Sequence, residues 1–198
     1  KSVKMRSYAP VRKGNRKQIK RAVELLLSAE RPIIYTGGGV VQGGAEKELT
    51  KMVQALGYPC TNTLMGLGGF PASDPLFIGM LGMHGTYESN MAMYECDVML
   101  AVGARFDDRV TGDLKKFSPT ARIIHVDADP TSIGKNVRVE VPIVGEAKDV
   151  LADMHGLIPD NGERSNRKAI EKWWQRIKEW QGLRSLSYDR GSELIKPQ

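Results

Sequence analysis

The sequence lacks several features that would place it in a special class of protein. Its 198 residues include two cysteines, Cys60 and Cys96, which are too few for a disulfide framework or a four-cysteine zinc site. No apolar run approaches the ~20 residues that a transmembrane helix needs. Residues 1–6 lead into no apolar signal-peptide core. We therefore expect a cytoplasmic protein without a membrane partner.

Catalytic and metal-binding motifs are also missing. The chain contains no G-x-S-x-G, no H-E-x-x-H and no G-x-x-x-x-G-K-[ST] motif. Neither cysteine has a histidine close to it in the sequence, and His84, His125 and His155 fall in separate predicted elements. The sequence therefore predicts neither a catalytic residue nor a metal ligand.

Positive charge is concentrated at the start of the chain. The net charge is +6, and residues 1–21 contribute +9 because they contain nine Lys or Arg and no acidic residue, so the remainder carries −3. Such an arm could bind nucleic acid. No aromatic platform or RNA-binding motif accompanies it, so a solvated linker and helix face are favoured and no nucleic-acid partner is predicted. A basic-armed nucleic-acid-binding module remains an alternative.

The hydrophobic pattern predicts an α/β fold. Apolar runs typical of buried strands occupy residues 32–36, 58–63, 97–102, 121–126 and 139–144. Helical patterns fall before, between and after them, at residues 15–31, 45–56, 86–95, 146–157 and 166–181. Residues 64–85 are expected to form a glycine-rich loop. This alternation predicts a doubly wound, mostly parallel Rossmann-like sheet with helices on both faces. Ligands of such sheets lie beyond the carboxyl ends of the strands.

Three segments are expected: a basic linker at residues 1–14, the α/β domain at residues 15–158, and a C-terminal helix with a further linker at residues 159–198. The last helix carries an apolar stripe of Ile170, Trp173, Ile177 and Trp180. This stripe could be an outer layer of the sheet or a docking face for another domain. Because little sequence follows to cover it, we predict a docking face in a longer protein. In this chain alone the stripe is expected to pack on the sheet, to self-associate or to be poorly ordered.

Glycines and charged residues at the predicted strand ends suggest a nucleotide site. Gly37–Gly39 follow the first strand and allow close approach of a phosphate, with Gln42 at the third glycine position of a dinucleotide fingerprint. Asp127 lies 24 residues after Gly103, a spacing typical of a carboxylate that holds ribose hydroxyls. A helix cap ahead of Pro130 is the alternative role for Asp127.

Two further runs have open interpretations. Glycines flank Met83 and His84, and Met suits the edge of a flavin ring, although composition alone favours an ordinary loop histidine. Arg105 and Arg109 could neutralise a pyrophosphate. The Asp107–Asp108 pair beside Arg109 could be an acid/base site or an ion-pair network that stiffens a loop.

Three runs together resemble the central domain of acetolactate synthase (acetohydroxyacid synthase) catalytic subunits: LGMHGT from Leu81, GARFDDRVTG from Gly103 and HVDADPTSI from His125. The likeness extends over residues 6–198. It implies that residues 15–158 form an FAD-binding central domain in which FAD has a structural role. It also implies that residues 159–198 lead to a thiamine-diphosphate-binding domain outside this chain.

The resemblance further implies the activity of a longer enzyme. Members of the family condense pyruvate with pyruvate or 2-oxobutanoate, with loss of CO2, in isoleucine and valine biosynthesis. They use thiamine diphosphate and Mg2+, which other domains bind, and the Gly-Asp-Gly motif of those domains is absent here. This chain alone is therefore expected to be inactive. Its expected partners are the other domains of its subunit, further subunits in a homodimer or tetramer, and a small regulatory subunit.

The resemblance assigns cofactor contacts residue by residue. The ribityl and phosphate region of FAD would contact Gly37, Gly38, Gly39 and Gln42, the last an Asn in some members. The flavin would be surrounded by Thr63, Leu64, Met65, Gly82, Met83, His84 and Gly85. The flavin and pyrophosphate would be wrapped by Gly103, Ala104, Arg105, Asp107 and Arg109. The adenosine would contact Asp127, Ala128, Ser132, Ile133, Gly145 and Glu146. The substrate channel would be lined by Met83, Asp108 and Arg109. A free-standing NAD-dependent oxidoreductase is the alternative enzyme, but it would need a catalytic acid or base that is not evident.

Overall fold

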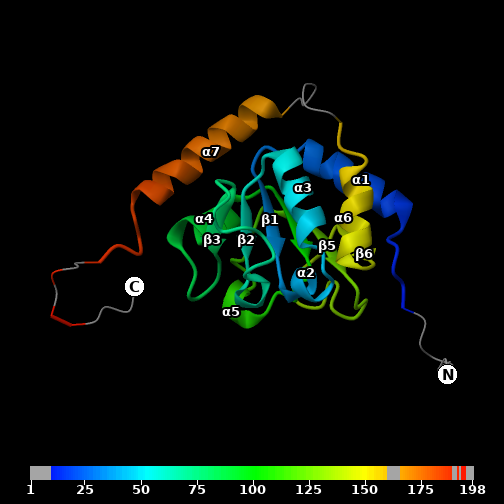
Figure 1. Cartoon of the computed structure of the whole chain (residues 1–198), viewed down its shortest axis with the longest axis horizontal. Coiled ribbons are helices and arrows are strands. Elements are labelled where there is room, and N and C mark those ends of the chain that lie inside the picture. Colours follow the sequence, from blue (N-terminus) through cyan, green and yellow to red (C-terminus); the bar gives the residue numbers. More distant parts are fainter. Residues whose placement is uncertain (1–9, 160–165, 189–190, 192, 195–198) are drawn as a thin grey trace.

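The computed structural model describes residues 10–159, 166–188, 191, 193 and 194. Its centre is one parallel sheet in the order β3-β2-β1-β4-β5-β6 (Figure 1). The strands are β1 (Pro32–Thr36), β2 (Cys60–Asn62), β3 (Phe77–Met80), β4 (Val98–Val102), β5 (Arg122–Asp127) and β6 (Val141–Val144). This is the order of dinucleotide-binding sheets, so the predicted fold class is confirmed.

Helices cover both faces of the sheet. They are α1 (Arg16–Leu27), α2 (Gly38–Gln42), α3 (Glu46–Leu56), α4 (Tyr87–Glu95), α5 (Asp108–Thr111), α6 (Ala147–His155) and α7 (Arg167–Gly182), with a short 3-10 turn, η1 (Leu64–Gly66). Asn15 caps α1, because its side chain accepts hydrogen bonds from the backbone N–H groups of Lys17 and Gln18. The helix ends at Leu27, earlier than the expected residue 31, and Pro32 begins β1 as predicted.

The sheet has one strand more than the sequence predicts. β3 lies inside residues 64–85, which were expected to be loop, and it pairs with β2 across an irregular register. Its third residue, Gly79, has φ +100, a backbone conformation that favours glycine. A glycine in the middle of a four-residue strand gives the pattern of a turn, which explains why the prediction was wrong.

Alternate strand residues face two separate cores. In β1, Ile34 packs with α1, α3 and α6 on one face, whereas Ile33 and Tyr35 pack with α4 and α7 on the other. Every residue of β1 and β4 is buried, as expected for central strands that are covered on both sides. The alternation follows from the two-residue period of a strand.

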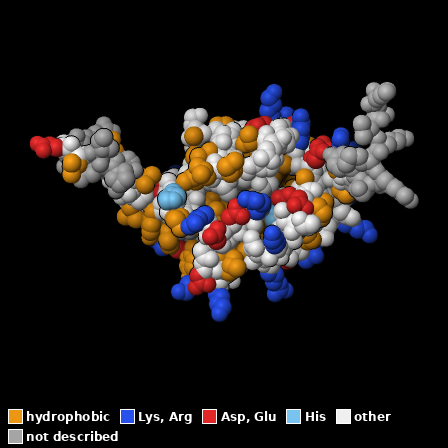
Figure 2. All heavy atoms as spheres, turned by 90° about the horizontal axis from the view of Figure 1, so that it is seen from below, with side chains coloured by type: hydrophobic (Ala, Val, Ile, Leu, Met, Phe, Trp, Pro, Cys, Tyr) orange, Lys and Arg blue, Asp and Glu red, His pale blue; other side chains and the backbone are white. Residues whose placement is uncertain are grey.

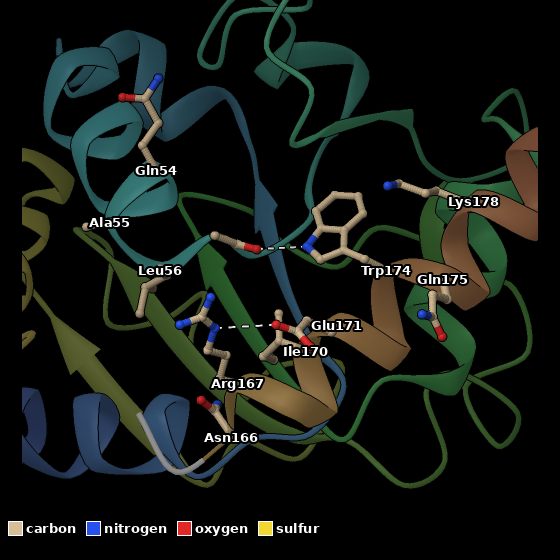
Figure 3. Close-up of a pocket in the computed structure, with 11 residues that line it drawn as sticks. Gln54, Ala55, Leu56, Asn166, Arg167, Ile170, Glu171, Trp174, Gln175 and Lys178 are labelled. Atoms are coloured by element: carbon tan, nitrogen blue, oxygen red, sulfur yellow. Dashed lines mark hydrogen bonds and ion pairs between the residues drawn. The ribbon is translucent and has the colours of Figure 1, made fainter. Parts of the chain in front are cut away.

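The apolar stripe of α7 packs on the sheet, which is one of the outcomes expected for this chain alone; a docking face in a longer protein stays a prediction. Trp173, Ile177 and Trp180 are buried in the α4-side core, and the indole N–H of Trp173 donates to the carbonyl of Pro32 at 3.0 Å. Trp174 is half-buried and donates to the carbonyl of Gly57 at 2.8 Å, across a groove between α3 and α7 (Figure 3). Indole groups that satisfy buried carbonyls fix the helix on the strands.

Several predicted segments lie partly outside the described residues. These are residues 1–9 of the basic linker, residues 160–165 of the loop before α7, and residues 189–190, 192 and 195–198 of the tail. Within the described part of the chain, no helix is long and apolar enough to cross a membrane.

Candidate functional site

Six loops meet at one edge of the sheet, where the carboxyl ends of all six parallel strands lie. Figure 1 shows α2 and α5 at this edge, below the strands, and Figure 2 views the molecule from that side. Every residue of the predicted FAD site follows one of these strand ends or, in the case of Asp127, forms its last residue. The structure therefore brings the predicted residues to one edge, although contact with a cofactor remains a prediction.

Glycines pack against each other where the strand order reverses, between β1 and β4. The N–H of Gly37 donates to the carbonyl of Val102 at 2.9 Å, and the N–H of Gly39 donates to the carbonyl of Gly103 at 3.0 Å. A Cβ on Gly39 would lie 2.6 Å from the Cα of Gly103, closer than real Cβ contacts allow. Only glycine fits there, and the reversal point of such a sheet is where dinucleotides bind. Gln42, the last residue of α2, is exposed.

Apolar side chains are exposed beside this contact, at the ends of β2 and β3. Thr63 caps η1, and the two residues after it, Leu64 and Met65, are about 70% exposed. A Cβ on Gly38 would contact the Cβ of Met65 at 3.2 Å, so the β1 and β2 loops touch. Met83 is also exposed. Figure 2 shows hydrophobic and charged side chains side by side on this face. Such a surface suits a flat aromatic group.

The Gly82–Gly85 turn is joined to the loop after β4. Asn90 of α4 accepts from the N–H of Gly82 and donates to its carbonyl, which fixes the start of the turn. The N–H of Met83 then donates to the carbonyl of Arg109 at 2.9 Å. The predicted channel residues thus lie on two adjoining segments, Met83 on the turn and Asp108 and Arg109 in the first turn of α5. His84 is exposed on the turn.

The loop after β4 is held by an aromatic anchor. Phe106 has φ +57 and is buried, with its ring edge-on to Tyr35, Phe117 and His125 at 5.1–5.9 Å. The Asn136 amide donates to the carbonyls of Arg105 and Phe106. An aromatic residue in the left-handed region is strained, so burial of the ring and the two hydrogen bonds must hold it there. The sequence analysis predicts a positioning role for neither Phe106 nor Asn136, and the sequence contains no signal for the Asn136 contacts.

The charged residues of this loop remain at the surface. Arg105, Asp107, Asp108 and Arg109 are all exposed, and Arg105 pairs with Asp107 at 3.0 Å. This distance favours the ion-pair interpretation for Asp107. Ala104 is buried and fixes the base of the loop. An exposed guanidinium of this kind can exchange its carboxylate partner for a phosphate.

Asp127 ends β5 and shapes a turn. One of its carboxylate oxygens accepts from the N–H of Asp129 at 2.8 Å, and the other lies 3.9 Å from Nε2 of His125. Residues 128–140 form turns and no helix, so the alternative of a helix cap ahead of Pro130 is wrong. Ala128, Ser132 and Ile133 lie in these turns, and Ser132 donates to Asp129.

The last two predicted contacts are partly covered by the segment before α1. The N–H of Gly145 donates to the carbonyl of Asp127, and the N–H of Glu146 donates to the carbonyl of Arg12 at 2.7 Å. Arg12 and Glu146 also form an ion pair at 3.5 Å. A Cβ on Gly145 would meet the N of Gly14 at 2.9 Å. Residues 12–14, expected to be part of a linker, therefore lie against this edge of the sheet.

Nucleophilic and metal chemistry has little support in the described residues. Cys60 and Cys96 are both fully buried, and burial raises the pKa of each thiol, that of Cys96 to about 12. Neither cysteine is therefore a thiolate at neutral pH. Within the described ranges no three His, Cys, Asp or Glu side chains are grouped to hold a metal ion.

Comparison with known proteins identifies the family. Residues 19–154 match the sequence profile of the thiamine pyrophosphate enzyme central domain. The chain belongs to this family. Relatives of this central domain include the acetolactate synthase large subunit of Haemophilus influenzae (48% identical over 99% of the chain) and the isozyme 3 large subunit of Escherichia coli K12 (48% over 100%). A probable acetolactate synthase large subunit of Methanocaldococcus jannaschii is 46% identical over 99% of the chain.

The central domain covers 34%, 34% and 32% of those three relatives, so the chain spans about a third of their length. The profile ends at residue 154 and so excludes α7, which nevertheless packs on the sheet. The structure of this central domain therefore includes a helix beyond the part that the profile matches.

Proposed function

We propose that this chain binds FAD across the carboxyl edge of its sheet and serves as the central domain of an acetolactate synthase catalytic subunit. The supporting observation is that the predicted contact residues all lie along the carboxyl edge of the sheet, on both sides of the glycine-packed reversal point between β1 and β4. High identity to acetolactate synthase large subunits along the whole chain supports the choice of enzyme. Residues 15–158 would form the FAD-binding unit, with linkers at residues 1–14 and 159–198.

One unsatisfied buried group at this edge fits a flavin dinucleotide. Asn62, the last residue of β2, is fully buried, and its amide nitrogen has no hydrogen-bond partner among the described residues. Its carboxamide oxygen accepts from Thr36 at the end of β1. A buried donor at a strand end is costly unless a partner supplies an acceptor. Exposed Leu64 and Met65 nearby offer an apolar surface for a flat ring.

The chain's own residues would bind and orient the dinucleotide. The carboxylate of Asp127 would accept from ribose hydroxyls, since only one of its oxygens bonds within the turn. Arg105 would pair with a phosphate in place of Asp107, and Asn136 would hold the carbonyl side of that loop. The bound FAD would stabilise the domain, since the overall condensation involves no net redox change.

The complete enzyme would act through parts outside this chain. Thiamine diphosphate and Mg2+ would be bound by other domains, and pyruvate would be condensed with pyruvate or 2-oxobutanoate, with loss of CO2, on the way to isoleucine and valine. This subunit would form a homodimer or tetramer in the cytoplasm, with a small regulatory subunit. The chain alone would have no activity, because the residues that activate thiamine diphosphate and hold it with Mg2+ would belong to those other domains.

A cofactor titration tests the proposal. The purified chain should quench flavin fluorescence in a saturable way on addition of FAD, and riboflavin should bind more weakly because it lacks the phosphates and the adenosine. Saturable binding of NAD without binding of FAD would instead favour the oxidoreductase alternative. Formation of acetolactate from pyruvate, thiamine diphosphate and Mg2+ by this chain alone would contradict the expected inactivity.

A further inference from the structure

The sulfur atoms of the chain differ sharply in their access to solvent. Both cysteines, Cys60 and Cys96, are fully buried, and burial raises the pKa of each thiol. Because an oxidant such as hydrogen peroxide attacks the exposed thiolate form of cysteine, neither thiol is available to it. A methionine thioether has no proton to lose and reacts wherever it is exposed. Exposed methionines are therefore the sulfur groups that peroxide can reach in the described part of the chain.

Exposure distinguishes two methionines from the others. The side chains of Met65 and Met83 are exposed, at 70% and 62% of the residue surface. The other methionines among the described residues are less accessible. Two of these are half-buried and four are buried, namely Met80 and Met91 in the first group and Met52, Met93, Met99 and Met154 in the second.

Both exposed thioethers lie at the carboxyl edge of the sheet, the side that Figure 2 shows. Met65 belongs to η1 after β2, and Met83 belongs to the turn after β3, which is the neighbouring strand. The backbone at each position is held, since the N–H of Met83 donates to the carbonyl of Arg109 and Met65 lies against Gly38. Neither side chain belongs to a core cluster. A chemical change at either sulfur would therefore alter the surface of this edge without disturbing the packing of the sheet.

We propose that Met65 and Met83 form a reversible peroxide-sensitive modification site, whose oxidation lowers the affinity of the carboxyl edge for FAD. In each oxidation a sulfur–oxygen bond forms and the oxygen–oxygen bond of hydrogen peroxide breaks. The sulfur is oxidised to the sulfoxide, and the peroxide is reduced to water by the sulfur's electron pair. The transferred oxygen gives its proton to the departing hydroxide. A methionine sulfoxide reductase reverses the step, with two thiols that become a disulfide while the oxygen leaves as water.

The effect on FAD rests on the proposed function. A thioether is apolar and polarisable and makes favourable contacts with the edge of an aromatic ring, whereas a sulfoxide is polar. Conversion of both side chains would remove two such contacts with the flavin and place polar groups beside it. A bound flavin would in turn cover the two sulfur atoms, so FAD should protect them from peroxide.

The first test locates the oxidation. The folded chain is treated with hydrogen peroxide, with and without saturating FAD, and tandem mass spectrometry follows the gain of one oxygen at each methionine. Met65 and Met83 should be oxidised first, and FAD should slow both reactions. The buried Met52 and Met99 are internal controls that should stay unmodified while the midpoint of urea unfolding is unchanged. Oxidation of these controls at the same rate would overturn the proposal.

The second test measures the consequence by flavin fluorescence. Peroxide should weaken FAD binding to the parent chain about tenfold, and treatment with the reductase should restore it. The affinity of Met65→Leu/Met83→Leu, whatever its starting value, should be the same before and after peroxide, because leucine has no sulfur. Met80→Leu/Met91→Leu is the matched control, since it removes two half-buried thioethers and should keep the tenfold loss.

Two results of the second test would overturn the proposal. One is an unchanged FAD affinity in a parent chain that carries both sulfoxides, and the other is an equal loss in Met65→Leu/Met83→Leu. Absence of FAD binding before any peroxide is added would instead contradict the proposed function. The order of oxidation found by mass spectrometry does not depend on FAD, so the two failures are distinguishable.

Discussion

The two faces of the sheet are built differently. The face covered by α1, α3 and α6 is packed with a continuous apolar cluster, in which Leu49, Met52 and Val53 of α3 are fully buried. The face covered by α4 and α7 contains the buried His125, the strained Phe106 and an open hollow beside β5. The first face provides stability alone, whereas the second also positions the loops of the candidate site.

The segments that connect the strands account for this difference. The helices α3 and α6 contact each other over the first face and close it. On the second face, the chain between α5 and β5 forms turns instead of a helix that packs on the sheet. Aromatic rings pack in that space, and side-chain hydrogen bonds hold the segment in place. Irregular segments place functional side chains more freely than helices do, but each needs its own anchor.

A pair of core substitutions gives the largest expected effect. Leu49→Ala should destabilise the chain by about 2–5 kcal/mol and Phe106→Ala by about 3–5 kcal/mol, since both side chains are fully buried. Only Phe106→Ala should also weaken FAD binding, because it releases the loop carrying Arg105. Urea unfolding and flavin fluorescence, measured under conditions where both variants are folded, check the two parts. Equal FAD affinity in both variants would contradict the division of roles between the faces.

The second prediction concerns the glycine contact between the two halves of the sheet. Gly39→Ala should cost about 1–3 kcal/mol and weaken FAD binding, since the added Cβ forces the β1 and β4 loops apart. Gly156→Ala is the control, because its Cβ would lie at an ordinary 3.6 Å from its neighbour and its φ is −63. If Gly39→Ala unfolded at the same denaturant concentration as Gly156→Ala, the close contact would have no energetic importance.

The parts of this architecture that the sequence predicts are those with a regular signal. Gly or Asp at the predicted strand ends indicated which edge of the sheet carries the candidate site, because the carboxyl ends of parallel strands all lie at the same edge. The sequence could not predict the two residues that anchor the loop after β4. Asn136 bonds to Arg105 from 31 positions away, and no local pattern reports such a contact. The left-handed backbone of Phe106 is likewise invisible in the sequence, where it looks like an ordinary apolar residue. The stripe of α7 predicts burial, but the pattern does not reveal whether the sheet or another domain buries it.

A third, smaller effect is expected at Asp127. A hydrogen bond to a charged acceptor contributes roughly 1.5–3 kcal/mol, so Asp127→Ala should weaken FAD binding about ten- to a hundredfold. Asp127→Asn keeps an oxygen that can accept from the N–H of Asp129 and removes the charge. It should therefore preserve the turn but recover only part of the affinity in a fluorescence titration. Full recovery would show that Asp127 acts only through the turn.

The smallest predicted effect is a pH dependence that arises on the α4 and α7 face alone. His125 is fully buried, and neither ring nitrogen has a hydrogen-bond partner among the described residues. Burial lowers the pKa of His125 below its usual value near 6.5, although the charge of Asp127 and, less strongly, the backbone of Ala104, which is not at ideal hydrogen-bond geometry, oppose this shift. Between the lowered pKa and 6.5, the unfolded chain binds a proton that the folded chain does not. The free energy of unfolding should therefore fall as the pH drops below about 6.5, by at most about 1.4 kcal/mol per pH unit from this group, and be fully retained above it.

His125→Leu isolates this contribution. Leucine fills a similar space without a polar atom, so the variant should keep its stability at pH 8 and lose part of the decline between pH 6.5 and pH 5. His84→Leu, at an exposed position, should leave the decline unchanged. Urea unfolding at a series of pH values measures the difference. If both variants followed the parent chain, the acid sensitivity would come from groups elsewhere, and the buried histidine would not distinguish the two faces.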